Sequence, residues 1–172
     1  MPDSFHTDRL RIHPMAPEDL GAQAKLNADV EVMRHLTGRA STAEESATEF
    51  ESSLGTRWSV FSHETGEFLG WVGAVPAATG EYDVGWRFRR SAWGRGFATE
   101  AARELVEQLF AEGAVRLFAQ TMAVNERSRA VMTRIGFTFV RTLHLEFEDP
   151  LPGTEKGEVE YELTRATWQQ RS

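Results

Sequence analysis

The sequence contains no cysteine, and only two of its 172 residues are lysine. Without cysteine there can be no disulfide, no thiolate metal site, no cysteine nucleophile and no covalent thioester on the protein. No run of about 18 apolar residues predicts a membrane-spanning helix, and the N-terminus lacks the apolar core of a signal peptide. We therefore expect a cytoplasmic protein with no membrane partner.

Acidic residues outnumber basic ones by 26 to 19, so the formal net charge is −7. This balance argues against a general nucleic-acid-binding protein, which is normally basic. A hydrophobic fraction of 41% excludes disordered and collagen-like classes. The length predicts a single domain over residues 1–172.

The hydrophobic pattern predicts a mixed α/β fold. Alternating or strongly apolar segments indicate strands at residues 9–13, 58–62, 68–75, 82–88, 115–122, 137–147 and 158–164. Helical spacing and capping residues indicate helices that begin at Pro17 and that cover residues 30–36, 42–54, 97–112 and 125–135.

A glycine-containing turn connects the strand at 82–88 to the most amphipathic helix, at 97–112. Gly94 and Gly96 allow the main chain to approach a ligand closely. The free N–H groups and positive dipole of a helix start suit a phosphate group. The segment matches neither the P-loop pattern nor the dinucleotide-binding fingerprint. It is either a diphosphate site or simply a tight turn.

Four arginines favour the diphosphate interpretation. Residues 85–99 contain no acid and carry a charge of +4, whereas the rest of the chain carries −11. A local positive charge beside a helix N-terminus is typical of a site for a small polyanion. The four are Arg87, Arg89, Arg90 and Arg95.

Four segments together resemble the GNAT superfamily of acetyl-CoA-dependent N-acetyltransferases. They are Thr-Asp-Arg-Leu-Arg-Ile at 7–12, Asp-Val-Gly-Trp at 83–86, Trp-Gly-Arg-Gly-Phe-Ala-Thr-Glu-Ala at 93–101, and Asn-Glu-Arg-Ser-Arg-Ala-Val at 125–131 running into Ile-Gly-Phe at 135–137. More narrowly, the chain is similar to the branch of ribosomal-protein N-terminal acetyltransferases. Ser91 departs from the family pattern, which often has Gln or Arg at that position, and this puts one side-chain contact in doubt.

The resemblance implies a central, twisted, mostly antiparallel sheet of about seven strands, splayed in the middle and flanked by helices. It implies that acetyl-CoA is the cosubstrate. It also implies the residues that bind this cosubstrate, which are Trp86, Phe88, Arg89, Gly94, Arg95, Gly96, Phe97, Ala98, Thr99, Asn125 and Ser128.

The implied reaction is direct attack of a neutral amine on the acetyl thioester in a ternary complex. Ser128 would donate a proton or hydrogen bond to the leaving thiolate, or it is an ordinary first-turn residue of a helix capped by Asn125. Asp83 would accept the amine proton through water, or it is a solvent-facing carboxylate on a strand. The five histidines lack metal-ligand spacing. Of these, His35 and His144 would contact either the acceptor or only surface residues.

The acceptor would be a primary amine, on a small molecule or a protein N-terminus. Residues 146–162 carry a charge of −6, with Glu158, Glu160 and Glu162 on one strand face. This region either attracts a cationic amine or forms a solvated sheet edge that resists pairing. Homodimers are common in the branch, so a homodimer is a further expectation.

Two other functions stay open on the sequence. One is an acyl-CoA-binding sensor without turnover, and the other is an unrelated nucleotide-binding α/β domain. The presence of both Asn125 and Ser128 favours the catalytic interpretation.

Overall fold

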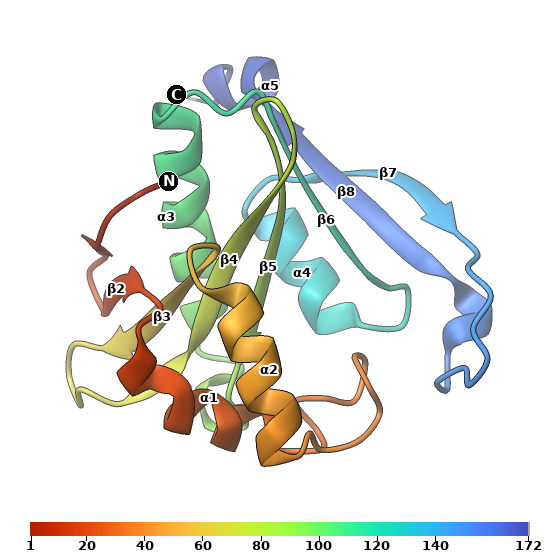
Figure 1. The fold of residues 1–172 in the computed structure, drawn as a ribbon. Coiled ribbons are helices and arrows are strands. Elements are labelled where there is room, and N and C mark those ends of the chain that lie inside the picture. Colours follow the sequence, from red (N-terminus) through yellow and green to blue (C-terminus); the bar gives the residue numbers. More distant parts are fainter. Residues whose placement is uncertain (172) are drawn as a thin grey trace.

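An eight-stranded sheet runs through the protein in the order β1-β2-β3-β4-β5-β6-β8-β7, and the computed structural model describes it within residues 1–171 (Figure 1). All neighbouring strands are antiparallel except β5 and β6, which are parallel. The strands are β1 (Phe5–His6), β2 (Leu10–Pro14), β3 (Arg57–Ser62), β4 (Phe68–Ala78), β5 (Glu81–Phe88), β6 (Arg116–Met122), β7 (Thr138–Leu143) and β8 (Glu158–Thr164). The mixed α/β, mostly antiparallel fold is therefore confirmed.

Helices cover both faces of this sheet. They are α1 (Leu20–Asn27), α2 (Ala43–Ser53), α3 (Phe97–Ala111), α4 (Glu126–Arg134) and the short α5 (Arg165–Gln169). The main core lies under α3 and α4, where Leu105 and Phe110 pack against Val60 and Val72 of the sheet. A smaller cluster on the opposite face joins Leu26 of α1 and Phe50 of α2 to Trp71 of β4.

The helix starts follow the expected capping chemistry. Thr42 accepts a hydrogen bond from the N–H of Glu45, and the Glu45 side chain returns one to the N–H of Thr42. This reciprocal pair satisfies two donors that the helix leaves free. Asn125 caps α4 in the same way, by accepting from the N–H of Ser128 at 3.3 Å.

Several predicted elements are wrong in type or length. Residues 30–36 form successive turns rather than a helix. The edge strand β7 ends at Leu143, well before the expected Phe147. The two-residue β1 and the short α5 had no periodic signal, because neither is long enough to show one. The sheet consequently has eight strands rather than about seven. Among residues 1–171, no helix is long and apolar enough to cross a lipid bilayer.

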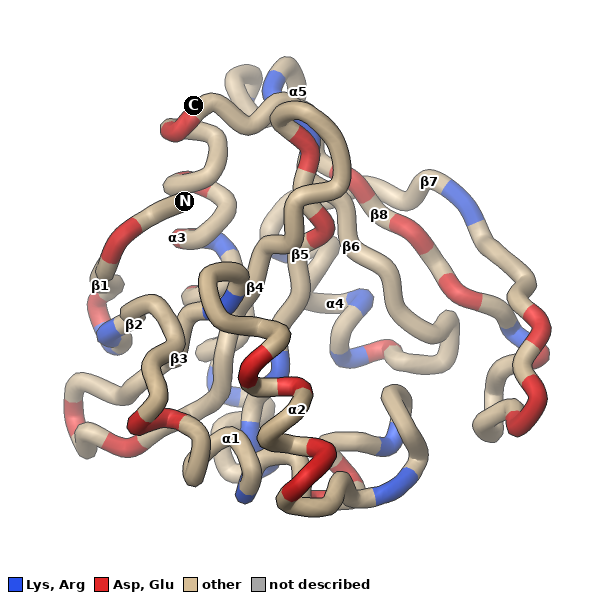
Figure 2. Tube along the Cα trace, in the orientation of Figure 1, with Lys and Arg blue, Asp and Glu red and all other residues tan. Residues whose placement is uncertain are grey.

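The arginines at 87–95 do not form one positive patch, which is the main correction to the charge argument. Figure 2 shows acidic and basic residues interspersed over the chain. Arg87 pairs with Glu49 at 3.1 Å, Arg89 with Glu67 at 3.0 Å, and Arg90 with Asp29 at 2.7 Å. Each of these acids comes from a distant part of the chain, so the local sum of +4 missed them.

Within residues 1–171, Arg95 is the arginine of this group without an ion pair. Its guanidinium carbon lies 4.7 Å from the centre of the Phe97 ring, at the start of α3. Of the four arginines, Arg95 therefore keeps the charge that was expected beside a diphosphate.

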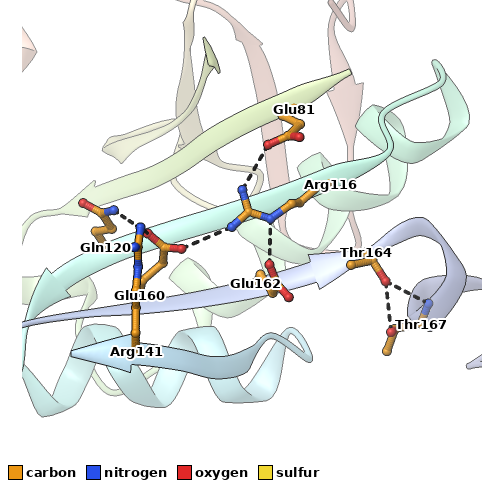
Figure 3. A network of polar contacts seen from close by, with 8 residues as sticks. All are labelled: Glu81, Arg116, Gln120, Arg141, Glu160, Glu162, Thr164 and Thr167. Carbon is orange, nitrogen blue, oxygen red and sulfur yellow. Dashed lines mark hydrogen bonds and ion pairs between the residues drawn. The ribbon is translucent and has the colours of Figure 1, made fainter. Parts of the chain in front are cut away.

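A network centred on Arg116 joins the two halves of the sheet (Figure 3). Its guanidinium contacts Glu81 of β5 at 3.0 Å, and Glu160 and Glu162 of β8 at 3.1 and 2.6 Å. Arg141 of β7 also pairs with Glu160, at 3.2 Å. The pKa of Glu160 is lowered overall, because burial raises it but Gln120, Arg141 and Arg116 lower it more.

The acidic strand is therefore not a solvated edge, and that interpretation is wrong. β8 lies between β6 and β7, and Glu160 is only 3% exposed. Because Arg116 and Arg141 neutralise Glu160 and Glu162, these residues offer little free negative charge to an amine.

Replacing Arg116 by Met should lower the free energy of unfolding by about 2 kcal/mol, because it removes one charged hydrogen-bond partner from the buried Glu160. Denaturant unfolding followed by circular dichroism measures this. Arg103→Met is the matched control, since Arg103 is exposed and donates only to the carbonyl of Arg134. Equal effects of the two substitutions would contradict a structural role for the network.

Candidate active site

A gap opens in the sheet between β5 and β6. Their parallel pairing covers only Glu81 with Arg116, Tyr82 with Leu117, and Asp83 with Phe118. Beyond Asp83, β5 continues to Phe88 and β6 continues to Met122, but the two strands no longer pair with each other. The expected splay in the middle of the sheet is present.

Beyond Asp83, successive residues of β5 direct their backbone N–H and C=O groups alternately toward β4 and toward this gap. The N–H of Arg89 donates to the carbonyl of Leu69 at 2.9 Å, so odd-numbered residues of β5 bond to β4. The backbone groups of Trp86 and Phe88 consequently face the gap. The Phe88 carbonyl accepts from the Trp93 indole at 2.8 Å, which leaves the N–H and C=O of Trp86 and the N–H of Phe88 facing an open strand edge.

The end of β5 leads into a loop whose glycines have positive φ. Gly94 has φ of 70° and Gly96 has φ of 79°, a region that other residues enter only with strain. Gly96 is the N-cap of α3, and the N–H of Glu100 donates to its carbonyl at 3.0 Å. The N–H groups of Phe97, Ala98 and Thr99 precede that bond, so they lack an acceptor within the helix.

No side chain caps α3 within the described residues, because its N-cap is glycine. An anion at this position would satisfy the free N–H groups and interact favourably with the helix dipole. The loop geometry therefore fits a diphosphate.

Arg9 of the N-terminal segment holds this loop in place. Its guanidinium pairs with Glu100 at 2.6 Å and donates to the carbonyl of Arg95 at 2.9 Å. Thr7 also donates to Glu100. The opening Thr-Asp-Arg segment thus fixes the turn at 93–101, although 91 residues separate Arg9 from Glu100.

A cavity of about 240 Å³ passes through the gap. On the α3–α4 face it is lined by Trp86, Trp93, Ala98, Asn125, Ser128 and Met132, among others. On the opposite face it is lined by Trp71, Arg87 and the loop residues Glu31, Val32, His35 and Leu36. Two ligands can therefore meet in the gap from opposite faces.

Asn125 and Ser128 occupy the α4 side of this cavity. The Asn125 side chain caps the helix and donates to the hydroxyl of Thr121 at 3.0 Å. Among the described residues, the Ser128 hydroxyl has no hydrogen-bond partner, although its N–H is engaged by Asn125. A free hydroxyl in the cavity is available to a ligand.

Asp83 lies at the last paired position of β5, beside the start of the gap, but it does not line the cavity. Asp83 is an exposed residue, but its carboxyl is partly desolvated by the surrounding protein. This partial desolvation raises the pKa of Asp83 to about 6, and the negative charge of Glu160 adds to the rise.

His35 is a second titratable group, and it lines the cavity itself. Burial lowers the pKa of its imidazole, and the charges of Arg34 and Arg127 lower it further, against an opposing effect of Glu31. These effects together favour the neutral imidazole. On the sequence, His35 was one of two histidines that would contact either the acceptor or only surface residues.

Sequence reasoning missed most of the face around Trp71. Trp58 does not contribute to this face, since it is 2% exposed and donates its indole N–H to the Pro2 carbonyl. Trp71 does line the cavity, as do Trp86 and Trp93. The pairing of Arg87 with Glu49 of α2 has no local signal, because the two residues lie 38 positions apart.

Comparison with known proteins agrees with this geometry. Residues 9–138 match the model of the acetyltransferase (GNAT) domain. The chain is 35% identical, over 182 aligned positions, to the FsC-acetyl coenzyme A-N(2)-transacetylase of Aspergillus fumigatus, covering 96% of this chain and 77% of that protein.

Solved structures share the fold. A GNAT-family acetyltransferase from Bacillus anthracis superposes with a TM-score of 0.81 at 21% identity, covering 95% of this chain and 99% of that one. Spermidine N-acetyltransferase from Vibrio cholerae, solved with CoA and spermine, gives a TM-score of 0.80 at 13% identity, with coverages of 95% and 99%. With the matched domain and the transacetylase relative, this chain belongs to the GNAT acetyltransferase family and is an acetyl-CoA-dependent N-acetyltransferase.

Proposed function

We propose that the protein acetylates a primary amine by direct attack within a ternary complex. The neutral amine nitrogen forms a bond to the acetyl carbon, the bond from that carbon to the CoA sulfur breaks, and the surplus amine proton leaves to a base. The thiolate takes up a proton, so the products are an amide and free CoA. No covalent intermediate on the protein and no metal take part in this scheme.

The observation that carries the proposal is a cavity that crosses the sheet where β5 and β6 separate. Acetyl-CoA would enter from the α3–α4 face and the amine from the face of Trp71. The gap would let the thioester and the amine meet between the strands.

The cofactor contacts follow from the local geometry. The amides from Gly94 to Thr99, including those of Arg95, Gly96, Phe97 and Ala98, would hold the diphosphate at the start of α3. The side chain of Arg95 would add a positive charge, whereas Arg89 already pairs with Glu67. Backbone groups of Trp86 and Phe88 would pair with the pantetheine arm as an added strand does.

Asn125 and Ser128 lie where the thioester would end. The Trp86 N–H would stabilise the developing negative charge on the acetyl oxygen. Ser128 would donate its hydroxyl proton or a hydrogen bond to the departing thiolate. Asp83 would receive the amine proton through water.

The acceptor is an amine of a small molecule or a protein N-terminus. Among the similar proteins, one is named for transfer to a nitrogen N(2) and another for acetylating spermidine. Membership of the ribosomal-protein branch rests on the four segments at 7–12, 83–86, 93–101 and 125–137 and stays a proposal. A cytoplasmic location, a homodimer and a single unit over residues 1–172 are proposals as well.

Gly94→Ala should weaken acetyl-CoA binding about tenfold, because it strains the backbone that presents the N–H groups. Calorimetric titration with CoA measures the change. Gly55→Ala is the matched control, since Gly55 has φ of 83° and, like Gly94, has no atom within 4 Å of an added Cβ. A similar loss of affinity in both variants would remove the loop from the binding site.

Ser128→Ala should lower kcat by about tenfold to a hundredfold while leaving KM for acetyl-CoA within about twofold, because the hydroxyl acts when the thiolate leaves. Stopped-flow detection of released thiol measures both constants. Thr133→Ala on the same helix is the control, since Thr133 donates only to the Arg129 carbonyl. Full turnover in a folded Ser128→Ala variant would end the assignment.

The value of kcat/KM should decrease as the pH is lowered through about 6. The pKa of Asp83 is raised to about 6, and protonation of its carboxylate removes the base. Asp83→Asn should abolish this acidic limb and lower kcat at pH 7, whereas His35→Asn should retain the limb. The pH profiles of kcat/KM for the two variants decide between these residues. Loss of the limb in His35→Asn alone would transfer the role of base to His35.

A further inference from the structure

Two partly buried arginines share one carboxylate on the face of the sheet that the amine would approach. Arg57 of β3 and Arg87 of β5 lie 2.9 and 3.1 Å from the same oxygen, Oε1 of Glu49 in α2. Their side chains are 17% and 10% exposed, and that of Glu49 is 27% exposed. Arg87 also donates to the side-chain oxygen of Asn27 at 2.6 Å. We call Arg57 and Arg87 the arginine pair.

Trp71 lies between the members of this pair. The guanidinium carbon of Arg57 is 3.9 Å from the centre of the Trp71 ring, and that of Arg87 is 5.2 Å away. Trp71 is 7% exposed, which makes the cluster a fixed part of the fold.

The charge of the cluster is not balanced within the described residues. Two guanidinium groups face one carboxylate, which leaves one positive charge in a largely dry environment. Burial lowers the pKa of Arg57, and Arg87 lowers it further, while Glu49 opposes both effects. The Arg87 Nε and the Trp71 indole N–H are buried without a partner among residues 1–171. Unmatched buried charge and unpaired donors are costly, so both indicate a missing acceptor group.

The cluster belongs to the cavity rather than to the interior alone. Trp71 and Arg87 line it together with Gly85, and Ser128 lines its far side. Val32 and Leu36 add an apolar wall on the side of the arginine pair. A ligand that reaches the gap from this side passes beside a positive charge.

We propose that Arg87, supported by Arg57 and Trp71, recognises an oxygen of the acceptor, so that the acceptor is an amine with a carbonyl or carboxylate group next to its amino-bearing carbon. Amino acids, their esters and amides, and peptide N-termini all have this chemistry. Such an oxygen supplies the missing hydrogen-bond acceptor and, when it is a carboxylate, the missing negative charge. A simple polyamine would instead bring further positive charge toward two arginines. The inference rests on the proposed function, which it narrows to one class of acceptor.

The test compares L-leucinamide with 3-methylbutylamine, which share a carbon skeleton and differ by the carboxamide group. Thiol release from acetyl-CoA gives kcat/KM for each amine in the wild type and in Arg87→Gln. The ratio of the two kcat/KM values, amide over plain amine, should fall about tenfold or more in the variant. The difference in amine basicity is the same for both proteins, so it cancels in this comparison.

Two further variants separate recognition from folding. Arg87→Gln leaves Arg57 and Glu49 as a balanced pair, so the variant should fold, and Arg87→Lys should give an intermediate ratio because it keeps the charge without the planar fork. Arg39→Gln is the matched control, since Arg39 pairs with Glu45 on the surface outside the cavity. Its ratio should equal that of the wild type.

An unchanged ratio in Arg87→Gln, with thiol release from either amine, would overturn the recognition and leave the acetyltransferase function intact. Calorimetric titration of the CoA-bound protein with L-leucinamide provides the second readout. Binding that Arg87→Gln weakens, in the absence of thiol release, would support the recognition and count against the proposed reaction. The absence of both binding and release at millimolar L-leucinamide would overturn the recognition.

Discussion

The short pairing between β5 and β6 is the constraint on which the rest of the site depends. Parallel strands that stayed paired along their length would leave no free backbone groups and no passage through the sheet. Here the pairing ends at Asp83, and the network around Arg116 holds the strands together on the paired side of that point. The gap beyond it provides an open strand edge at Trp86 and a cavity that reaches both faces.

The two faces of this gap carry different groups that can bind a ligand electrostatically. On one side the start of α3 offers free N–H groups and the charge of Arg95, held in place by Arg9 and Glu100. On the other side the arginine pair offers one unbalanced positive charge beside Trp71. Both sides therefore favour ligands that carry oxygen, which explains how a chain with a net charge of −7 can accommodate a polyanionic cofactor.

The sequence predicted the parts of the fold whose signals are local. The helix at α3, the cap at Asn125, the glycine turn and the strand β8 all follow from spacing and residue type, and the structure has them at or near the expected residues. The family resemblance supplied the splayed sheet, which no periodicity could have shown.

The incorrect predictions from the sequence involve residues whose interaction partners are distant in the chain. Summing charge over residues 85–99 missed Asp29, Glu49 and Glu67, each of which forms an ion pair with one of the four arginines. The negative charge of β8 was likewise overestimated, because Arg116 and Arg141 arrive from other strands. Residues 30–36 have apolar residues at helical spacing, but they form turns that carry His35 to the cavity. Local sums of charge and spacing cannot detect such tertiary partners.

A crystal structure of the protein with bound CoA tests the central claim most directly. The account predicts that the pantetheine arm lies between β5 and β6, bonded to the backbone of Trp86, with the diphosphate on the amides from Gly94 to Thr99. CoA bound elsewhere, with the gap between β5 and β6 empty, would contradict it.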